Sequence, residues 1–378
     1  MDRAFAGNEN NYWENEMTLK ITNIRARPVA APMKRPPMSA SGAISSAALV
    51  LVDLETDGGI TGRTYLFAFM PSMLKPTVEC VEALGDLLRG DEVAPLAIDA
   101  KLRKRFTILD VHGILGQALA GVDMAAWDAL SQSQGMPLVR SLGGEVRPVR
   151  AYNSCGLWIQ DPARVADEAE ELLAEGNYNA VKIRIGRPDF KDDLAAVRNV
   201  KKRIGDDVFL MSDFNQSLTV NEAIARGQAL DDEGLYWIEE PVRHDDYAGC
   251  ARIAAAVNTP IQLGENLLNS MEMQRAIDAG SAEFYMPDVQ RIGGVTGWLR
   301  AATLAQVHSL DMSSHLFPEI SSHLLAVTPT CHWLEYMDWG TAVLKDPVQV
   351  KDGHVLIADR PGTGIEWDED AVKRYAVA

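Results

Sequence analysis

Between Arg150 and Met337 the sequence alternates short apolar segments with stretches of helical periodicity, and this alternation limits the fold more than any other feature. The intervening stretches include KDDLAAVRNVKKRIG and VNEAIARGQALDDEG, in which apolar residues recur at helical spacing. Eight apolar strands that alternate with helices are what a closed parallel β/α barrel requires. The eight segments are RAYNSC, AVKIRIG, VFLMSDFN, LYWIEEP, PIQLGEN, EFYMPDV, DMSSHLF and WLEYM.

The carboxyl ends of these expected strands carry acidic side chains at a regular interval. Asp213, Glu239 and Glu265 close the third, fourth and fifth strands, and 26 residues separate each from the next. That interval is close to one β/α unit, because eight units make a barrel of ~250 residues. We therefore expect the three carboxylates to meet at the C-terminal mouth of the barrel, where the active sites of such barrels lie.

Three carboxylates that meet without a counter-charge repel one another strongly. At ~4 Å and an effective dielectric constant of about 20, each pair costs on the order of 4 kcal/mol. A bound divalent cation removes this repulsion, and a ligand set made only of oxygen favours Mg²⁺ or Mn²⁺ over zinc. The alternative is purely structural, with the three acids paired to Lys and Arg side chains.

Further polar residues close the remaining strands. Asp288 ends the sixth strand and His315 ends the seventh, 27 residues later. A carboxylate beside an imidazole raises the imidazole pKa and fixes its tautomer, which suits a general base, although a lone histidine at a strand end is usually structural. Lys182 and Arg184 are two residues apart on the second strand and point to the same side, where they also have the simpler role of neutralising the acids. Glu335 ends the eighth strand.

The segment before the barrel has a different order, in which strands come first and helices follow. KITNIRARPV alternates as a strand does, and AALVLVDLETDGGITGRTYLF predicts a hairpin with the turn Thr56-Asp57-Gly58-Gly59. VECVEALGDLLRG and LGQALAGVDMAAWDALSQ then have helical spacing. The fold class is thus α/β, an eight-stranded parallel TIM-type barrel with an N-terminal α+β capping domain.

These patterns divide the chain into four parts. We expect the capping domain over residues 18–147, the barrel over 148–345, and a C-terminal segment, 346–378, that packs back on the capping domain. Residues 1–17 are polar and lack periodicity, so we expect a disordered extension, or a true start of the chain at Met17.

Charge and cysteine content exclude several classes of protein. With 36 basic and 53 acidic residues the formal net charge is −17, so neither nucleic acid nor an anionic membrane is expected as a partner. No apolar run approaches 18 residues, and the N-terminus lacks the apolar region of a secretory signal. The four cysteines lie far apart and form no CxxC pair, which is typical of reduced thiols in a cytoplasmic protein.

Taken together, the motifs resemble those of the enolase superfamily, and specifically its mandelate racemase subgroup. The resemblance covers essentially the whole chain after Met17. It implies Mg²⁺ bound by the three strand-end acids, and abstraction of the α-proton of a small 2-hydroxycarboxylate through an enediolate. It also implies a homo-oligomer, an octamer. The motifs are GVDMAAWDAL, AVKIRIG, DFNQSL, WIEEP, GEN, MPDVQRIGGVTGW, SSHLFPEIS and HWLE.

The same resemblance assigns roles to individual residues. Lys182 and Glu335 would contact the substrate carboxylate, Glu335 as a hydrogen-bonding acid. Asp288 and His315 would form the base dyad on one face of the substrate. Polar contacts to the substrate would come from Ser154 and Asn215.

One position departs from the pattern of the subgroup, which has Lys-x-Lys on the second strand and uses the second Lys as the base on the opposite face. Arg184 stands there in this chain. A lysine can be brought to a pKa of ~7–8, whereas an arginine starts near ~12.5–13.8, and its neutral form at pH 7 costs roughly 7–9 kcal/mol. We therefore expect Arg184 to be a fixed cation or hydrogen-bond donor and His315 to be the only base, which suits β-elimination of water from a sugar acid.

The pocket loop and the choice of reaction leave alternatives open. In the family the loop after the first strand, here MKRPPMSASGAISS, closes over the substrate. Ile44 in this loop suits an apolar group of the substrate, as does Phe69. Lys34 and Arg35 suit an acidic group of the substrate or are simply solvated.

Three functions remain: a racemase or epimerase of a 2-hydroxy acid, favoured by resemblance; an acid-sugar dehydratase, favoured by Arg184; and a catalytically inactive binding or scaffold protein. A scaffold should not need Mg²⁺ to bind a carboxylate ligand.

Overall fold

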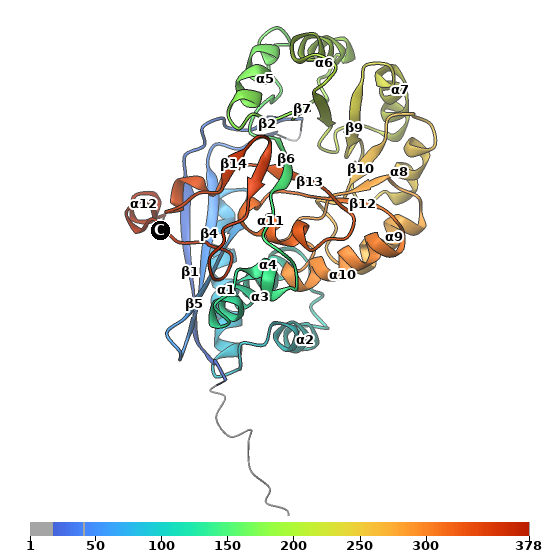
Figure 1. The fold of residues 1–378 in the computed structure, drawn as a ribbon. Coiled ribbons are helices and arrows are strands. Elements are labelled where there is room, and N and C mark those ends of the chain that lie inside the picture. The colour runs from blue at the N-terminus through green and yellow to red at the C-terminus, as the bar shows by residue number, and fades with distance from the viewer. Residues whose placement is uncertain (1–17, 41, 378) are drawn as a thin grey trace, which may run out of the picture.

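A closed barrel of eight parallel strands forms the larger part of the protein (Figure 1). The structure, a computed structural model, describes residues 18–40 and 42–377. Neighbouring strands follow chain order, and parallel pairing of the last strand with the first closes the barrel. The strands are β6 (Val149–Asn153), β7 (Ala180–Arg184), β8 (Phe209–Asp213), β9 (Leu235–Glu239), β10 (Ile261–Leu263), β11 (Phe284–Tyr285), β12 (Asp311–Ser314) and β13 (Cys331–Tyr336). This confirms the predicted fold class.

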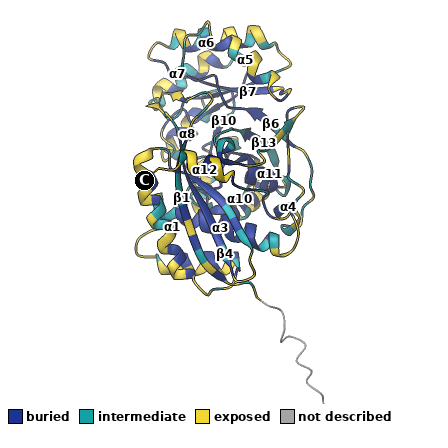
Figure 2. Ribbon diagram, turned by 90° about the vertical axis from the view of Figure 1, so that its left-hand side faces the viewer, coloured by how far each residue is buried: buried dark blue, intermediate teal, exposed yellow. Residues whose placement is uncertain are grey.

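Helices surround the barrel and bury one face against it (Figure 2). Because helices cover the outside and side chains fill the inside, β7 is buried at all five positions, as parallel strands usually are. Local signals set the helix starts; α7, for example, begins with a capping box between Thr219 and Glu222. The barrel helices are α5 (Val165–Ala174), α6 (Phe190–Ile204), α7 (Val220–Leu230), α8 (Tyr247–Ala254), α9 (Ser270–Asp278), α10 (Gly294–Val307) and α11 (Pro318–Ala326).

The N-terminal domain is a three-stranded antiparallel sheet, in the order β1-β4-β5, packed against helices. The predicted hairpin is present: Glu55 pairs with Thr61 across the turn. Gly62 allows close packing, because a Cβ atom there would lie 2.0 Å from the carbonyl oxygen of Ala125 in α3. The elements are β1 (Ile21–Ala31), β4 (Ala47–Thr56), β5 (Thr61–Phe67), η1 (Pro71–Met73), α1 (Leu74–Leu88), α2 (Pro95–Arg105), α3 (Gly113–Ser133) and α4 (Leu138–Ser141).

A short hairpin from this domain reaches the mouth of the barrel. Its strands are β2 (Met38–Ser39) and β3 (Gly42–Ala43). The loop after β6 holds it in place, since Ile159 N donates to Met38 O at 2.7 Å and Trp158 Nε1 donates to Arg35 O at 3.2 Å. The loop that the family resemblance expects to close over the substrate therefore rests on the barrel through hydrogen bonds to its own main-chain oxygen atoms.

The C-terminal segment divides its contacts between the two domains. Its hairpin, β14 (Gln349–Lys351) and β15 (His354–Leu356), extends the barrel sheet beside β6, whereas we expected packing on the N-terminal domain. Elsewhere in this segment Trp367 Nε1 donates to Asp53 Oδ1 at 2.7 Å, and α12 (Glu369–Tyr375) contacts both β1 and η2 (Thr341–Val343). We retain 18–147 and 148–345 as the proposed domain ranges, and the expectation for residues 1–17 lies outside the described residues.

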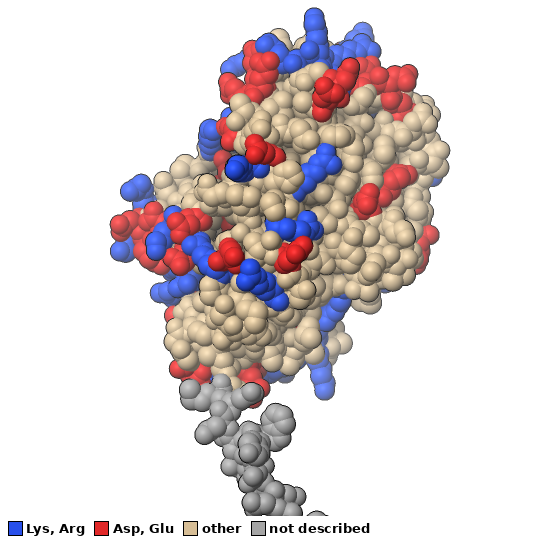
Figure 3. All heavy atoms as spheres, viewed as in Figure 1, with Lys and Arg blue, Asp and Glu red and all other residues tan. Residues whose placement is uncertain are grey.

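On the face shown in Figure 3, acidic and basic side chains lie in small mixed groups that are separated by uncharged surface. All four cysteines are free thiols. Among the described residues, none of the helices combines the length and apolarity that crossing a bilayer requires.

Candidate active site

Three acidic side chains converge at the C-terminal mouth of the barrel, as the 26-residue spacing predicts. Asp213 ends β8 and is the direct cross-strand partner of Glu239, which ends β9. Glu265 follows β10 after Gly264, whose φ of 140° and contact with Met286 leave no space for a side chain. One carboxylate oxygen of each acid lies within 4.8 Å of one from each of the others.

The negative charge of this cluster is only partly compensated. Burial raises the pKa of Glu239 to about 8 and also raises that of Asp213, and repulsion between the acids adds to this effect. Burial acts in the same direction on Glu265, but the charges of His315 and Arg291 outweigh it and hold that pKa below its usual range. Buried carboxylates that oppose one another's ionisation are stabilised by an added cation.

Lys182 offsets part of this negative charge. The structural alternative, in which the acids pair with basic side chains, is therefore partly correct. Its Nζ lies 2.8 Å from Glu239 Oε1, 2.8 Å from Glu335 Oε1 and 3.5 Å from Asp213 Oδ2. Burial lowers the pKa of Lys182, but these acids outweigh burial and raise it. One ammonium group against several carboxylates still leaves a surplus of negative charge.

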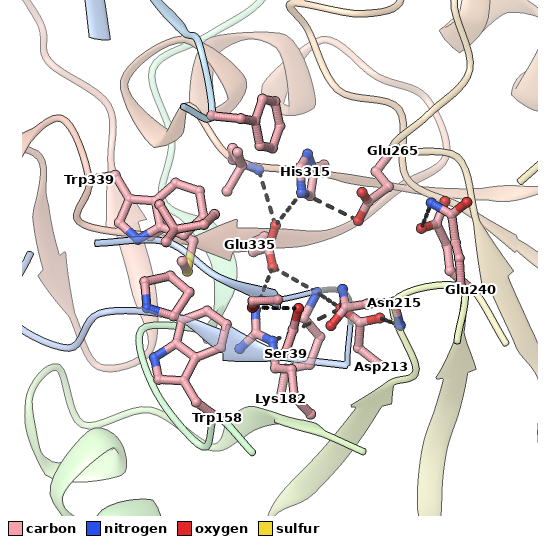
Figure 4. Close-up of a pocket in the computed structure, with 18 of the residues that line it drawn as sticks. Ser39, Trp158, Lys182, Asp213, Asn215, Glu240, Glu265, His315, Glu335 and Trp339 are labelled. Carbon is pink, nitrogen blue, oxygen red and sulfur yellow. Dashed lines mark hydrogen bonds and ion pairs between the residues drawn. The ribbon is translucent and has the colours of Figure 1, made fainter. Parts of the chain in front are cut away.

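His315 and Asp288 form the expected pair. The imidazole Nδ1 lies 2.7 Å from Asp288 Oδ2, while Nε2 lies 3.4 Å from Glu265 Oε2 and 3.8 Å from Glu335 Oε2. Burial lowers the pKa of His315, but Glu265, Asp288 and Glu335 outweigh burial and raise it to about 9. Asp288 thereby fixes one ring nitrogen and leaves Nε2 facing the acids (Figure 4).

Glu335 is surrounded by positively charged side chains. Burial raises its pKa, but the charges of Lys182, His315 and Arg184 outweigh it and hold the pKa well below its usual range. Its Oε2 accepts from Leu316 N at 3.1 Å. In this arrangement Glu335 accepts hydrogen bonds, and its role as a hydrogen-bonding acid toward the substrate stays a prediction.

Arg184 is held on several sides by hydrogen bonds and stacking. NH1 donates to Ser154 O at 2.8 Å and to Gly156 O at 3.1 Å, and NH2 donates to Ser154 Oγ at 2.8 Å. The guanidinium carbon lies 4.0 Å from the ring centroid of Trp158. Ser154 is fully buried and also donates to Glu335 Oε1 at 2.7 Å, so it supports these two side chains from behind the pocket.

A cavity of about 310 Å³ lies at this mouth, bordered by Lys182, Arg184, Asp213, Glu265, His315 and Glu335. One part is polar and contains Asn215, whose amide donates to Asp213 Oδ2 at 2.9 Å. The other part is apolar and contains Ile44 and Phe69. In Figure 4, Trp158 and Trp339 lie on the side of the pocket away from Glu265 and Glu240. Lys34 and Arg35 form ion pairs with Glu175 instead and do not line the cavity. The apolar lining is completed by Pro37, Ala43, Met70, Trp158, Leu316, Met337 and Trp339.

Several lining residues were not singled out in the sequence. Glu240 and Asn266 lie beside expected acids in the motifs WIEEP and GEN, and the amide of Asn266 donates to Glu240 Oε1 at 2.7 Å. Arg291 follows Asp288 by three residues. Trp158 and Trp339 come from loops that have no periodic pattern, so the sequence carried no signal for them.

Family comparisons agree with this geometry over nearly the whole chain. Residues 21–143 match the N-terminal domain of the mandelate racemase / muconate lactonizing enzyme family, and residues 164–371 match the family described as enolase C-terminal domain-like. This chain belongs to the enolase superfamily. Its mandelate racemase/muconate lactonizing enzyme domains supply both the barrel and the N-terminal sheet.

Similar enolase-superfamily proteins include enzymes with different reactions. An L-talarate/galactarate dehydratase of Salmonella typhimurium is 28% identical over 328 residues, covering 87% of this chain and 82% of that protein. A 3,6-anhydro-α-L-galactonate cycloisomerase of Streptomyces coelicolor is 33% identical over 342 residues, covering 90% and 94%. A Bradyrhizobium enolase solved with magnesium and mandelic acid has a TM-score of 0.92 and 42% identity, covering 96% of this chain and 100% of that one.

Proposed function

We propose that this chain is a Mg²⁺-dependent enzyme that removes the α-proton of a small 2-hydroxycarboxylate, with His315 as the base. The observation that carries this proposal is that an imidazole and three clustered carboxylates share one pocket, with His315 Nε2 only 3.4 Å from Glu265 Oε2. A substrate whose carboxylate lies beside the three acids, with a bound cation to offset the repulsion, would place its α-carbon near the imidazole.

The donor set supports a hard divalent cation. Asp213, Glu239 and Glu265 offer only carboxylate oxygen atoms, which Mg²⁺ prefers, and magnesium is present in the Bradyrhizobium relative. When bound, Mg²⁺ would supply positive charge that stabilises the enediolate left by proton loss.

The residues around the substrate have separate tasks in this proposal. Asp288 accepts a hydrogen bond from His315 Nδ1, so that Nε2, once it has lost its proton, presents its lone pair to the α-proton. A cation held by Glu265 would offset part of the carboxylate charge that raises the pKa of His315. Lys182 and Arg184 keep positive charge near Glu335 and the substrate carboxylate. Asn215 is placed to contact the substrate on the polar side of the pocket.

The hydrogen bonds of the Arg184 guanidinium favour a reaction that needs only one base. Its guanidinium donates three hydrogen bonds within the protein, and so it is a poor acceptor of a second α-proton. In dehydration, the C2 proton moves to His315 Nε2, hydroxide leaves C3, and His315 returns the proton to that oxygen to form water. The enol product then becomes a 2-keto acid. The dehydratase from Salmonella typhimurium supports this reaction class.

A racemase or epimerase of a 2-hydroxy acid is the second candidate. The apolar half of the pocket and the mandelic acid bound to the Bradyrhizobium relative favour it. Racemisation needs proton exchange on both faces of the substrate. The test of this candidate is therefore whether Arg184 exchanges a proton with the substrate.

One assay separates these two candidates. Aldonic acids, aldaric acids and 2-hydroxy acids are incubated with the protein and Mg²⁺, and products are followed both as 2-keto acids and by loss of optical rotation. Keto-acid formation supports dehydration, and rotation loss without keto acid supports racemisation. If neither occurs while the acids still bind, the scaffold function gains support.

Two further expectations belong with this proposal. The resemblance implies a homo-oligomer, an octamer, which light scattering after size-exclusion chromatography would test. The free state of all four cysteines supports a cytoplasmic location, which fractionation of cells would test.

A further inference from the structure

The side chain of Gln290 joins the two domains at the edge of the pocket. Its Oε1 accepts from Phe67 N at 2.7 Å, and its Nε2 donates to Phe67 O at 3.1 Å. Phe67 is the last residue of β5 in the N-terminal domain, and Gln290 is 1% exposed. The side-chain amide of Gln290 thus makes two hydrogen bonds to the main chain of Phe67, as a neighbouring strand would.

The main chain of the same residue supports the proposed base. Gln290 N donates to Asp288 Oδ1 at 2.7 Å, and Asp288 Oδ2 lies 2.7 Å from His315 Nδ1. Gln290 therefore contacts the N-terminal domain through its side chain and the base dyad through its backbone. These contacts set the separation between β5 and the base.

The end of β5 carries part of the apolar pocket wall. The ring centroid of Phe67 lies 4.4 Å from that of Phe69 and 4.6 Å from that of Trp339, and both neighbours line the cavity. Phe69 has a φ of 60°, a region that a bulky residue occupies only when its surroundings determine it. The position of the wall therefore depends on how Phe67 is held.

Other contacts keep the domains together away from the pocket. Thr296 N donates to Asp123 Oδ2 at 2.9 Å, and Trp127 Nε1 donates to Thr296 Oγ1 at 3.0 Å, which joins α3 to α10. Tyr65 also donates to Glu319 Oε2 at 2.8 Å. Because these bonds remain when Gln290 is changed, the amide of Gln290 acts locally, on the wall.

We propose that Gln290 is a positioning residue that holds the Phe67–Phe69 wall at a fixed distance from His315 and so selects substrates by the group attached to C2. This inference rests on the proposed function. A substrate with a large apolar group contacts the wall and depends on its position, whereas a substrate with a methyl group does not reach it.

The test compares two 2-hydroxy acids in D₂O with Mg²⁺: mandelate, which has a phenyl group, and lactate, which has a methyl group. Gln290→Met preserves volume and removes both side-chain bonds. We expect the ratio of kcat/KM for α-proton exchange, mandelate over lactate, to fall roughly 10- to 100-fold, mainly through KM for mandelate. Calorimetric titration with mandelate should reveal the same weakening without turnover.

Gln132→Met is the matched control. Gln132 Nε2 also donates to a main-chain oxygen of β5, Thr61 O at 2.9 Å, but at the opposite end of the strand. We expect this variant to keep the wild-type ratio. Gln290→Asn, which withdraws the amide by one methylene group and stays polar, should repeat the effect and serves if Gln290→Met does not fold.

The outcomes are distinguishable. An equal fall for both acids, or an unchanged ratio, overturns the positioning role, and so does the same ratio change in Gln132→Met. A wild-type protein that exchanges neither acid, and that converts none of the aldonic, aldaric and 2-hydroxy acids of the assay above, overturns the proposed function instead. If it converts sugar acids alone, an unchanged calorimetric affinity for mandelate in Gln290→Met overturns the positioning role.

Discussion

Arg184→Lys tests whether the second face of the bound substrate has a base. In the wild-type protein the guanidinium is 4% exposed and donates to Ser154 O, Gly156 O and Ser154 Oγ at 2.8–3.1 Å. It comes from β7, whereas His315 follows β12, three strands away around the closed barrel. We therefore expect proton exchange only on the face that His315 serves.

General base catalysis contributes about 10²–10⁴-fold, so the two enantiomers of a 2-hydroxy acid should differ by at least about 100-fold in exchange rate. (R)- and (S)-mandelate are incubated separately with the protein and Mg²⁺ in D₂O, and the α-proton signal is followed by NMR. His315→Asn should abolish the fast exchange. Similar rates for both enantiomers with wild-type protein would refute the argument and favour the racemase.

The lysine variant adds a group that can act as a base, at a cost in stability. A lysine replaces the branched guanidinium group of Arg184 by one ammonium group. It would lose about two of the three hydrogen bonds, each worth roughly 1.5–3 kcal/mol for a charged donor. Exchange of the slow enantiomer should nevertheless rise. Arg187→Lys is the control, because Arg187 is also buried and bonds Asp193 at 2.9 Å but does not line the pocket. It should lower the melting temperature without changing the enantiomer ratio.

Three further predictions concern the metal and the pH dependence of stability. Asp213→Asn should weaken Mg²⁺ binding by about 10- to 100-fold or more in calorimetry, with little loss of fold; unchanged affinity would contradict the assignment. Gly264→Ala should weaken Mg²⁺ binding in the same titration, because a Cβ atom there would lie 2.7 Å from Met286 N and displace Glu265. Burial lowers the pKa of His323 to about 4. Because the unfolded chain binds this proton more readily, stability should be full above pH ~6.5 and fall by about 3 kcal/mol as the pH drops to ~4. In urea unfolding at several pH values, His323→Gln should lack this contribution to the pH dependence of stability. The separate contribution of His332, whose pKa burial also lowers to about 4, should remain.

The barrel and the acid cluster were predictable because both depend on local pattern and spacing. Each strand segment is apolar and ends in polar residues, and parallel strands place their carboxyl ends at one edge. The direct pairing of Asp213 with Glu239 shows why a 26-residue interval sufficed to bring these side chains together. The 27-residue interval between Asp288 and His315 was informative for the same reason, since the two residues form an isolated parallel bridge.

The remaining features depend on contacts between distant parts of the chain. The pKa of Glu335 is lowered because Lys182 lies beside it, and Ser154 is withdrawn from the pocket because Arg184 and Glu335 use its hydroxyl. Spacing along the sequence does not specify such pairs. The same holds for Trp158 and Trp339, which reach the pocket from irregular loops, and for the C-terminal hairpin, whose β character did not reveal that its partner is β6.

The charges of the pocket make the order of binding a test of function. A substrate carboxylate adds negative charge to a site in which the described acidic side chains already outnumber the described basic ones. The acids are Asp213, Glu239, Glu240, Glu265, Asp288 and Glu335, and the basic side chains are Lys182, Arg184, Arg291 and His315. Repulsion should therefore keep mandelate from binding until a divalent cation is bound, and by linkage mandelate should raise the affinity for Mg²⁺ by the same factor.

Calorimetric titration of mandelate into the protein, once with Mg²⁺ and once with a chelator, measures this coupling. We expect heat of binding only with Mg²⁺. Equal affinity in both titrations would show that the existing cations suffice to hold a carboxylate. The acid cluster would then have no need of a metal, and the scaffold function would be the better explanation of this site.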